Sequence, residues 1–119
     1  MESVVEHKSY TFALRIVEMY KLLTSERKEF VLSKQVLRSG TSVGALIKEA
    51  EHAQSKADFL NKMNIALKEA NETEYWLMLL KDSQYLSEKE FNSIHKDCDE
   101  LICLLVSIVK TTKLKLGKN

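Results

Sequence analysis

The strongest candidate for metal chemistry in this sequence of 119 residues is a Glu-x-x-His pair, Glu49 with His52. A carboxylate-bridged di-iron site in a helical bundle takes such a pair from each of two helices, and one further inward Glu from each of the other two. The second position with suitable spacing reads Asn92-x-x-His95 and lacks the acid. The helical period also turns His52 toward the polar side of its helix. We therefore expect no metal and no other cofactor.

Enzymatic chemistry has little support in the sequence. No Ser/His/Asp or Cys/His arrangement has supporting local sequence, and no Gly-rich phosphate loop follows a strand. Glu74 falls within an apolar helical stripe, where a carboxylate is costly unless it is paired. It is either a perturbed acid in a site or, as we favour, a structural group paired with Arg38 or with the Thr41 and Ser42 hydroxyls. We expect a protein that is not an enzyme.

Two groups of cations have a spacing that suits phosphate contacts. Lys34, Arg38 and Lys48 share a narrow sector of one expected helix, and the second group follows the last apolar positions with no acid among its members: Lys110, Lys113, Lys115 and Lys118. The total of 18 basic against 17 acidic residues is nearly balanced, unlike a dedicated nucleic-acid domain. The alternative is that the first group is simply the solvated face of its helix, and that the second group is favoured by the negative end of the helix dipole. A symmetric ring would repeat each charge and favour phosphate contacts.

Small and apolar residues indicate where helices meet. Gly40 and Gly44 lie where a helix middle is expected, and each Gly costs about 1 kcal/mol relative to Ala there, so we expect another helix to approach closely. Phe12 and Met19 widen the apolar belt of the first expected helix beyond what one amphipathic face needs. That width predicts a central helix or a subunit contact. Trp76 is expected to be an aromatic residue at an interface rather than a platform for nucleic-acid bases.

The elements that position these residues are four long helices, expected at about residues 9–24, 29–53, 56–83 and 87–114. The chain has no Pro and only three Gly, which suits helices with short turns. Ser55 with Asp58 and Ser87 with Glu90 have the spacing of helix-capping pairs. Because short loops join antiparallel neighbours, we predict an all-α, antiparallel, up-down-up-down four-helix bundle. At this length, residues 1–119 are expected to form one domain.

Cysteine spacing and hydropathy bear on the cellular compartment. Cys98 and Cys103 lie five residues apart on one expected helix, which turns their thiols to different faces, as expected of a reduced protein. The N-terminus lacks the basic and apolar regions of a signal peptide. The longest apolar run, at 101–107, is too short to span a membrane. We expect a cytoplasmic protein with no membrane contact.

Nearly the whole chain resembles one known family. The resemblance rests on the runs RSGTSV at 38–43, IKEA at 47–50, SKADF at 55–59, ALKEA at 66–70 and ETEYWL at 72–77. It is to the bacterial four-helix bundle proteins of the 23S rRNA intervening-sequence family, which are often labelled ribosomal proteins. The chain departs from the family at Leu37, Leu46 and Ala50, where relatives often have Arg, usually Asn and often Gly.

The resemblance implies a ring-like homopentamer with no known enzymatic activity, and it favours an RNA-related role. We therefore expect an oligomeric bundle that associates with RNA through phosphate contacts. The alternative is a protein-interaction scaffold, a ring that binds a protein partner without touching nucleic acid. The two differ in salt response, because phosphate contacts weaken steeply as salt rises.

Overall fold

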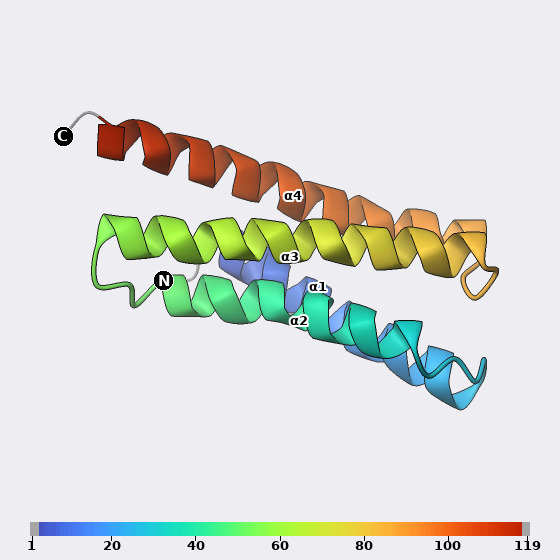
Figure 1. The fold of residues 1–119 in the computed structure, drawn as a ribbon. Helices are drawn as coiled ribbons and strands as arrows, with labels where there is room; N and C mark the ends of the chain where they lie inside the picture. Colours follow the sequence, from blue (N-terminus) through green and yellow to red (C-terminus); the bar gives the residue numbers. More distant parts are fainter. Residues whose placement is uncertain (1–2, 118–119) are drawn as a thin grey trace.

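The structure, a computed structural model, describes residues 3–117 and contains four α-helices and no strand in that range. They are α1 Val4–Ser25, α2 Leu32–Ala50, α3 Lys56–Asp82 and α4 Glu88–Gly117. Each helix runs opposite to the one before it (Figure 1). Contacts join α1 to α2, α2 to α3, α3 to α4 and α4 back to α1, whereas no described Cα atoms of the two diagonal pairs lie within 8 Å of each other. This is the predicted four-helix bundle, 52 Å long and 23 × 21 Å across.

The start of α1 differs from the prediction, because the helix begins at Val4 and not near Ser9. Ser3 is the N-cap, and its hydroxyl accepts a hydrogen bond from the Glu6 backbone N–H at 3.3 Å. The Ser3 hydroxyl also donates to the Glu6 carboxylate at 3.0 Å. Ser3 and Glu6 have the spacing of a helix-capping pair, a local signal that the predicted start near Ser9 did not use.

Helix α2 is shorter than the predicted range 29–53, and Glu29 is the reason for its later start. The Glu29 carboxylate accepts from the backbone N–H groups of Val31, Leu32 and Ser33 at 3.1, 3.0 and 2.6 Å. It therefore caps α2 from the preceding loop, where Lys28 has a left-handed φ of 55°. Burial opposes ionisation of Glu29, but the three donors outweigh it and lower the pKa of this carboxyl group.

The two capping pairs expected from the sequence are present. Ser55 accepts from the Asp58 backbone N–H at 3.0 Å at the start of α3. Ser87 accepts from the Glu90 backbone N–H at 3.1 Å, and the Glu90 carboxylate accepts from the Ser87 backbone N–H at 2.8 Å. These bonds satisfy backbone donors that a helix start leaves without an intrahelical partner. Helix α4 continues to Gly117, beyond the expected end near 114.

The core confirms a close approach of α1 and α2. A Cβ atom on Gly40 would lie 2.9 Å from Cγ1 of Ile16, so no side chain fits there without movement. A Cβ on Gly44 would lie 3.4 Å from the Ser9 carbonyl oxygen, which is ordinary contact. Phe12 and Met19 are buried in the bundle's own core. Of the two alternatives that the wide apolar belt left open, their burial fits a central helix and not a subunit contact.

No helix within residues 3–117 is both long and apolar enough to cross a membrane. Every buried side-chain nitrogen or oxygen in this part of the chain has a hydrogen-bond partner. The apolar side chains that α1 leaves exposed are Val4, Tyr10 and Leu14. Within the described residues, the buried polar atoms are therefore hydrogen-bonded, while several apolar side chains lie on the outer surface of the bundle.

Candidate functional site

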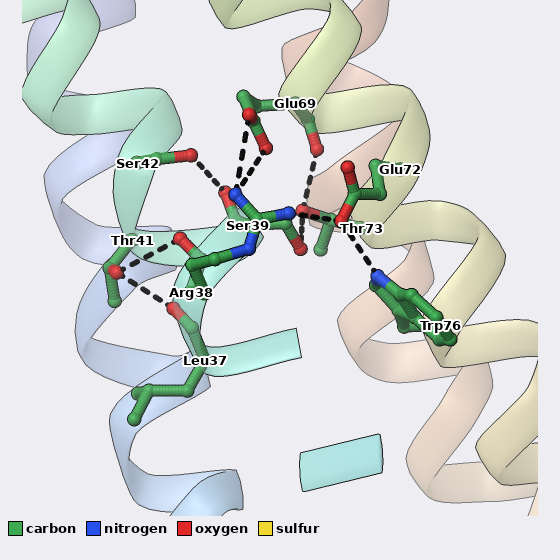
Figure 2. A network of polar contacts seen from close by, with 9 residues as sticks. All are labelled: Leu37, Arg38, Ser39, Thr41, Ser42, Glu69, Glu72, Thr73 and Trp76. Carbon is green, nitrogen blue, oxygen red and sulfur yellow. Dashed lines mark hydrogen bonds and ion pairs between the residues drawn. The ribbon is translucent and has the colours of Figure 1, made fainter. Parts of the chain in front are cut away.

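Arg38 joins α2 to α3 through two carboxylates, as Figure 2 shows. Its guanidinium lies 3.3 Å from the Glu69 carboxylate and also forms an ion pair with Glu72. Trp76 donates its indole N–H to Glu72 at 3.0 Å. The hydrogen bond to Glu72 raises the pKa of Arg38, while the Trp76 and Arg38 hydrogen bonds lower the pKa of Glu72. Arg38 thus has carboxylate partners within its own chain.

A buried hydroxyl pair lies beside this network. The Ser39 and Thr73 hydroxyls are hydrogen-bonded at 2.9 Å, and Thr73 also donates to the Glu69 carbonyl oxygen at 2.8 Å (Figure 2). Neither residue is exposed to solvent. Because a buried hydroxyl is costly without a partner, this pair favours one register of α2 against α3.

Glu74 has a different partner from the one expected. Its carboxylate lies 2.8 Å from Nε2 of His95, and both side chains are 32% exposed. The expectation of Arg38, Thr41 or Ser42 is wrong because Glu74 lies on the side of α3 that faces α4. The other two hydroxyls donate to α2 carbonyl oxygens instead, Thr41 to Leu37 and Ser42 to Ser39 (Figure 2).

The His95 ring is held by more than its carboxylate partner. It stacks on Phe91 with ring centroids 4.9 Å apart, and the Lys81 ammonium lies 4.5 Å from the centroid of the same Phe ring. Within residues 3–117, no group of three or more His, Cys, Asp or Glu side chains could hold a metal ion. The arrangement is a cross-helix contact between α3 and α4.

The two cysteines differ in environment, as their spacing predicted. Cys98 is buried and Cys103 is exposed. The Cys98 thiol lies 3.6 Å from the Ala70 carbonyl oxygen. Burial, together with the negative charges of Glu74 and Asp99, raises the pKa of this thiol to about 12. Cys98 is therefore an unreactive packing residue of the α3–α4 contact.

The expected phosphate-binding lysines are exposed wherever the structure describes them. Lys34 and Lys48 lie on α2, while Lys110, Lys113 and Lys115 lie in the last turns of α4. Among residues 3–117, none of these five forms an ion pair with an acid. Lys118 lies outside the described residues. Figure 1 shows the end of α4 at the same end of the bundle as the α2–α3 connection.

Sequence reasoning missed several ion pairs between helices, and the one with the most hydrogen bonds lies at the opposite end of the bundle. Arg27 donates two hydrogen bonds to the Glu90 carboxylate, at 2.8 and 2.7 Å, and one to the Tyr85 carbonyl oxygen at 2.7 Å. The Arg27 hydrogen bond and the Ser87 backbone N–H lower the pKa of Glu90 to about 2. The capping pair identified Glu90, but no local signal indicated Arg27.

Comparisons with known proteins agree with one another. The family model described as 23S rRNA-intervening sequence protein matches residues 1–107. A crystal structure from Bacteroides thetaiotaomicron, described as a protein of unknown function from the S23 ribosomal protein family, is 62% identical with a TM-score of 0.89. The match covers 90% of this chain and 99% of that one. No curated protein matches the sequence. The chain belongs to the 23S rRNA-intervening sequence protein family.

Proposed function

We propose that the protein is a non-enzymatic, oligomeric bundle that associates with RNA through phosphate contacts at the C-terminal end of α4. One observation carries this proposal: Lys110, Lys113 and Lys115 are exposed and have no acidic partner among the described residues. They follow Val109, the last buried position of α4. The three lysines therefore contribute little to the core and are free to meet an anionic partner.

The charge distribution supports phosphate contacts over base-specific ones. Lysine is a point charge that binds phosphate without reading sequence. Lys48, in the last turn of α2, is also exposed and adds another surface cation that could contact phosphate. Arg38 is less available to bind phosphate, because its guanidinium already forms ion pairs with Glu69 and Glu72. The family's description refers to 23S rRNA, which makes RNA the first partner to test.

The oligomer we propose is a homopentameric ring, as the family resemblance suggested. A ring would place several copies of the same lysine cluster around one axis, which raises the local positive potential above that of one subunit. A cytoplasmic location is part of the same proposal, because the RNA that we propose as partner is found in the cytoplasm.

A protein-interaction scaffold without RNA contact is the second candidate. It is favoured by the large apolar side chains that the bundle leaves exposed on several helices, among them Tyr10, Leu14, Tyr75 and Val106. An apolar interface of this kind would keep its affinity at high salt, whereas phosphate contacts would not.

The test compares two double variants of equal charge. Lys113→Gln/Lys115→Gln removes two lysines of the α4 end, and Lys68→Gln/Lys96→Gln removes two exposed lysines elsewhere. Binding to an RNA hairpin that carries a 23S rRNA intervening sequence is measured over a range of salt concentrations. For the α4 variant we expect weaker binding and a slope of log affinity against log salt shallower by about 0.7 to 0.9 for each phosphate that the variant no longer neutralises.

The control variant should bind the hairpin like the wild type. Equally weakened binding in both variants would indicate non-specific attraction, and unchanged binding by the α4 variant would overturn the site assignment. A wild-type protein that binds no RNA would overturn the RNA proposal, and the scaffold would then lead.

A further inference from the structure

A groove runs between α1 and α2 on the outside of the bundle, with a volume of about 510 Å³. That volume lies within the range of pockets that hold small ligands. Ala13 lines the groove from α1, and Gly44 and Ala45 line it from α2. Because these residues carry a methyl group or no side chain, they leave the surface hollow where larger residues would fill it. No part of residues 3–117 occupies the groove.

Tyr10 supplies an aromatic ring at this groove. Its side chain is 64% exposed, and no other aromatic ring within residues 3–117 packs against it. A free aromatic face can stack a nucleobase of any sequence, because every base has a π-face. The exposed ring of Tyr75 differs, since it already packs edge-on against Trp76 with centroids 5.1 Å apart. Tyr10 is therefore the exposed tyrosine that is available for stacking.

One cation and one carboxylate line the same groove, Lys48 and Glu6. Lys48 forms no ion pair among the described residues. The Glu6 carboxylate accepts from the Ser3 hydroxyl through Oε1 at 3.0 Å, and Oε2 has no hydrogen bond within residues 3–117. A bare phosphate would be repelled by Glu6. A nucleotide suits both charges, because its phosphate can meet the lysine and its base offers N–H donors to the carboxylate.

We propose that this groove binds an unpaired nucleotide of RNA, with the base stacked on Tyr10 and the phosphate at Lys48. The inference rests on the proposed function, because it names the part of the RNA that the protein holds. Bases in a duplex are already paired and stacked, so only a single-stranded segment can enter. The start of α1 and the end of α2 lie at the same end of the bundle as the end of α4 (Figure 1). One RNA can therefore contact the α4 lysines with a stem and the groove with a loop.

Tyr10→Leu tests the stacking contact, because leucine keeps apolar bulk but has no aromatic face. Binding of a short fluorescent single-stranded RNA and of a blunt RNA duplex is measured by anisotropy. We expect the single strand to bind about fivefold to a hundredfold more weakly, as for loss of one base stack. The duplex should bind within about twofold of the wild type. Tyr10→Phe keeps the ring and should bind both RNAs like the wild type.

Tyr75→Leu is the matched control, since Tyr75 is 57% exposed on α3 and lies outside the groove. It should bind the single strand and the duplex like the wild type. Ala45→Leu places bulk in the groove at an exposed position, so it should weaken single-strand binding as Tyr10→Leu does. Circular dichroism should show the same helix content for every variant.

The salt response separates the stacking contact from the phosphate contact. Lys48→Gln should make the slope of log affinity against log salt shallower by about 0.7 for the single strand, whereas Tyr10→Leu should leave the slope unchanged. Lys34→Gln, at an exposed lysine of α2 outside the groove, is the control and should keep the wild-type slope.

Crosslinking locates the bound base directly. A single strand that carries 4-thiouridine should crosslink to the tryptic peptide 9–15, which contains Tyr10. Unchanged single-strand binding by Tyr10→Leu, equal weakening by Tyr75→Leu, or equal losses for single strand and duplex would each overturn the groove proposal and leave RNA binding at the α4 lysines standing. A wild-type protein that binds neither RNA would overturn both proposals.

Discussion

Gly40 and Gly44 lie one turn apart on α2, yet a methyl group at these two positions meets different surroundings. At Gly40 it would press on Cγ1 of Ile16, a side chain with no exposed surface, while at Gly44 it would be in ordinary contact with the backbone and hydroxyl of Ser9. Replacing Gly by Ala in a helix raises the free energy of unfolding by about 1 kcal/mol where space allows. Overpacking a core lowers it by about 1–3 kcal/mol. The two positions should therefore respond with opposite sign.

We expect Gly40→Ala to lower the free energy of unfolding by about 1 kcal/mol and Gly44→Ala to raise it by about 0.5–1 kcal/mol. Urea denaturation followed by circular dichroism measures both, and each variant serves as the control for the other. Equal stabilisation in both variants would show that Ile16 moves aside freely and that the close approach does not restrict side-chain size.

Glu90 predicts a pH dependence at the same scale. Arg27 and the Ser87 backbone N–H lower the pKa of Glu90 to about 2 in the folded protein, against about 4.3 for an unperturbed Glu. The unfolded chain therefore binds the proton first as pH falls. The stability that this carboxylate contributes is present above the unfolded value and is lost as pH falls from there toward about 2.

Arg27→Gln should flatten this part of the profile, because the variant carboxylate has lost the donor that most lowers its pKa. Unfolding free energies of wild type and variant, measured between pH 6 and pH 3, should converge as the pH falls. A constant difference across that range would mean that Arg27 acts through packing or through the Tyr85 carbonyl oxygen alone.

At the scale of the element, the start of α2 depends on a residue that lies outside the helix. Glu29 accepts from three successive backbone N–H groups, those of Val31, Leu32 and Ser33. Val31, at the N-cap position itself, makes no side-chain cap. A helix start without such acceptors leaves its first donors unsatisfied.

Glu29→Ala should therefore lower stability by about 1–2 kcal/mol, as expected for removal of a helix cap. Hydrogen exchange should become faster at the amides of Val31, Leu32 and Ser33 before any change elsewhere. Glu26→Ala, an exposed acid in the same loop, is the control and should have little effect. Unchanged exchange at the three amides would show that α2 starts without this cap.

At the scale of the whole molecule, assembly and RNA binding should separate by their response to salt. The proposed oligomer would be held by apolar side chains that the bundle leaves exposed, such as Leu14, Tyr75 and Val106, and apolar contacts are not screened by salt. The proposed RNA contacts rest on lysine and phosphate, which release counterions. Raising salt should thus dissociate RNA while the oligomer persists.

Light scattering and hairpin binding, measured on one sample series from about 0.05 to 0.5 M salt, check this expectation. We expect RNA affinity to fall by about a hundredfold or more for several phosphate contacts, with an unchanged oligomer mass. Dissociation of both together would indicate that RNA itself holds the copies together.

The sequence predicted the helical elements well where local patterns control them. The apolar period placed four helices, and the pairs Ser55–Asp58 and Ser87–Glu90 form the expected caps. Two helix starts were predicted wrongly, for different reasons. At α1 the Ser3–Glu6 pair has the same capping spacing, a local signal that the prediction did not use. At α2 the cap is Glu29, which acts from a loop and is an acid that capping preferences do not favour.

What the sequence determined by itself is the all-α bundle, because helix propensity, capping and apolar period are properties of neighbouring residues. Only the tertiary structure decided the partners of the charged groups: Arg38 pairs with Glu69 and Glu72, Glu74 with His95, and Arg27 with Glu90. It also decided that Phe12 and Met19 are core residues while Leu14, Tyr75 and Met78 stay exposed. These outcomes depend on the rotation and spacing of each helix against its neighbours, and side-chain packing between helices fixes both.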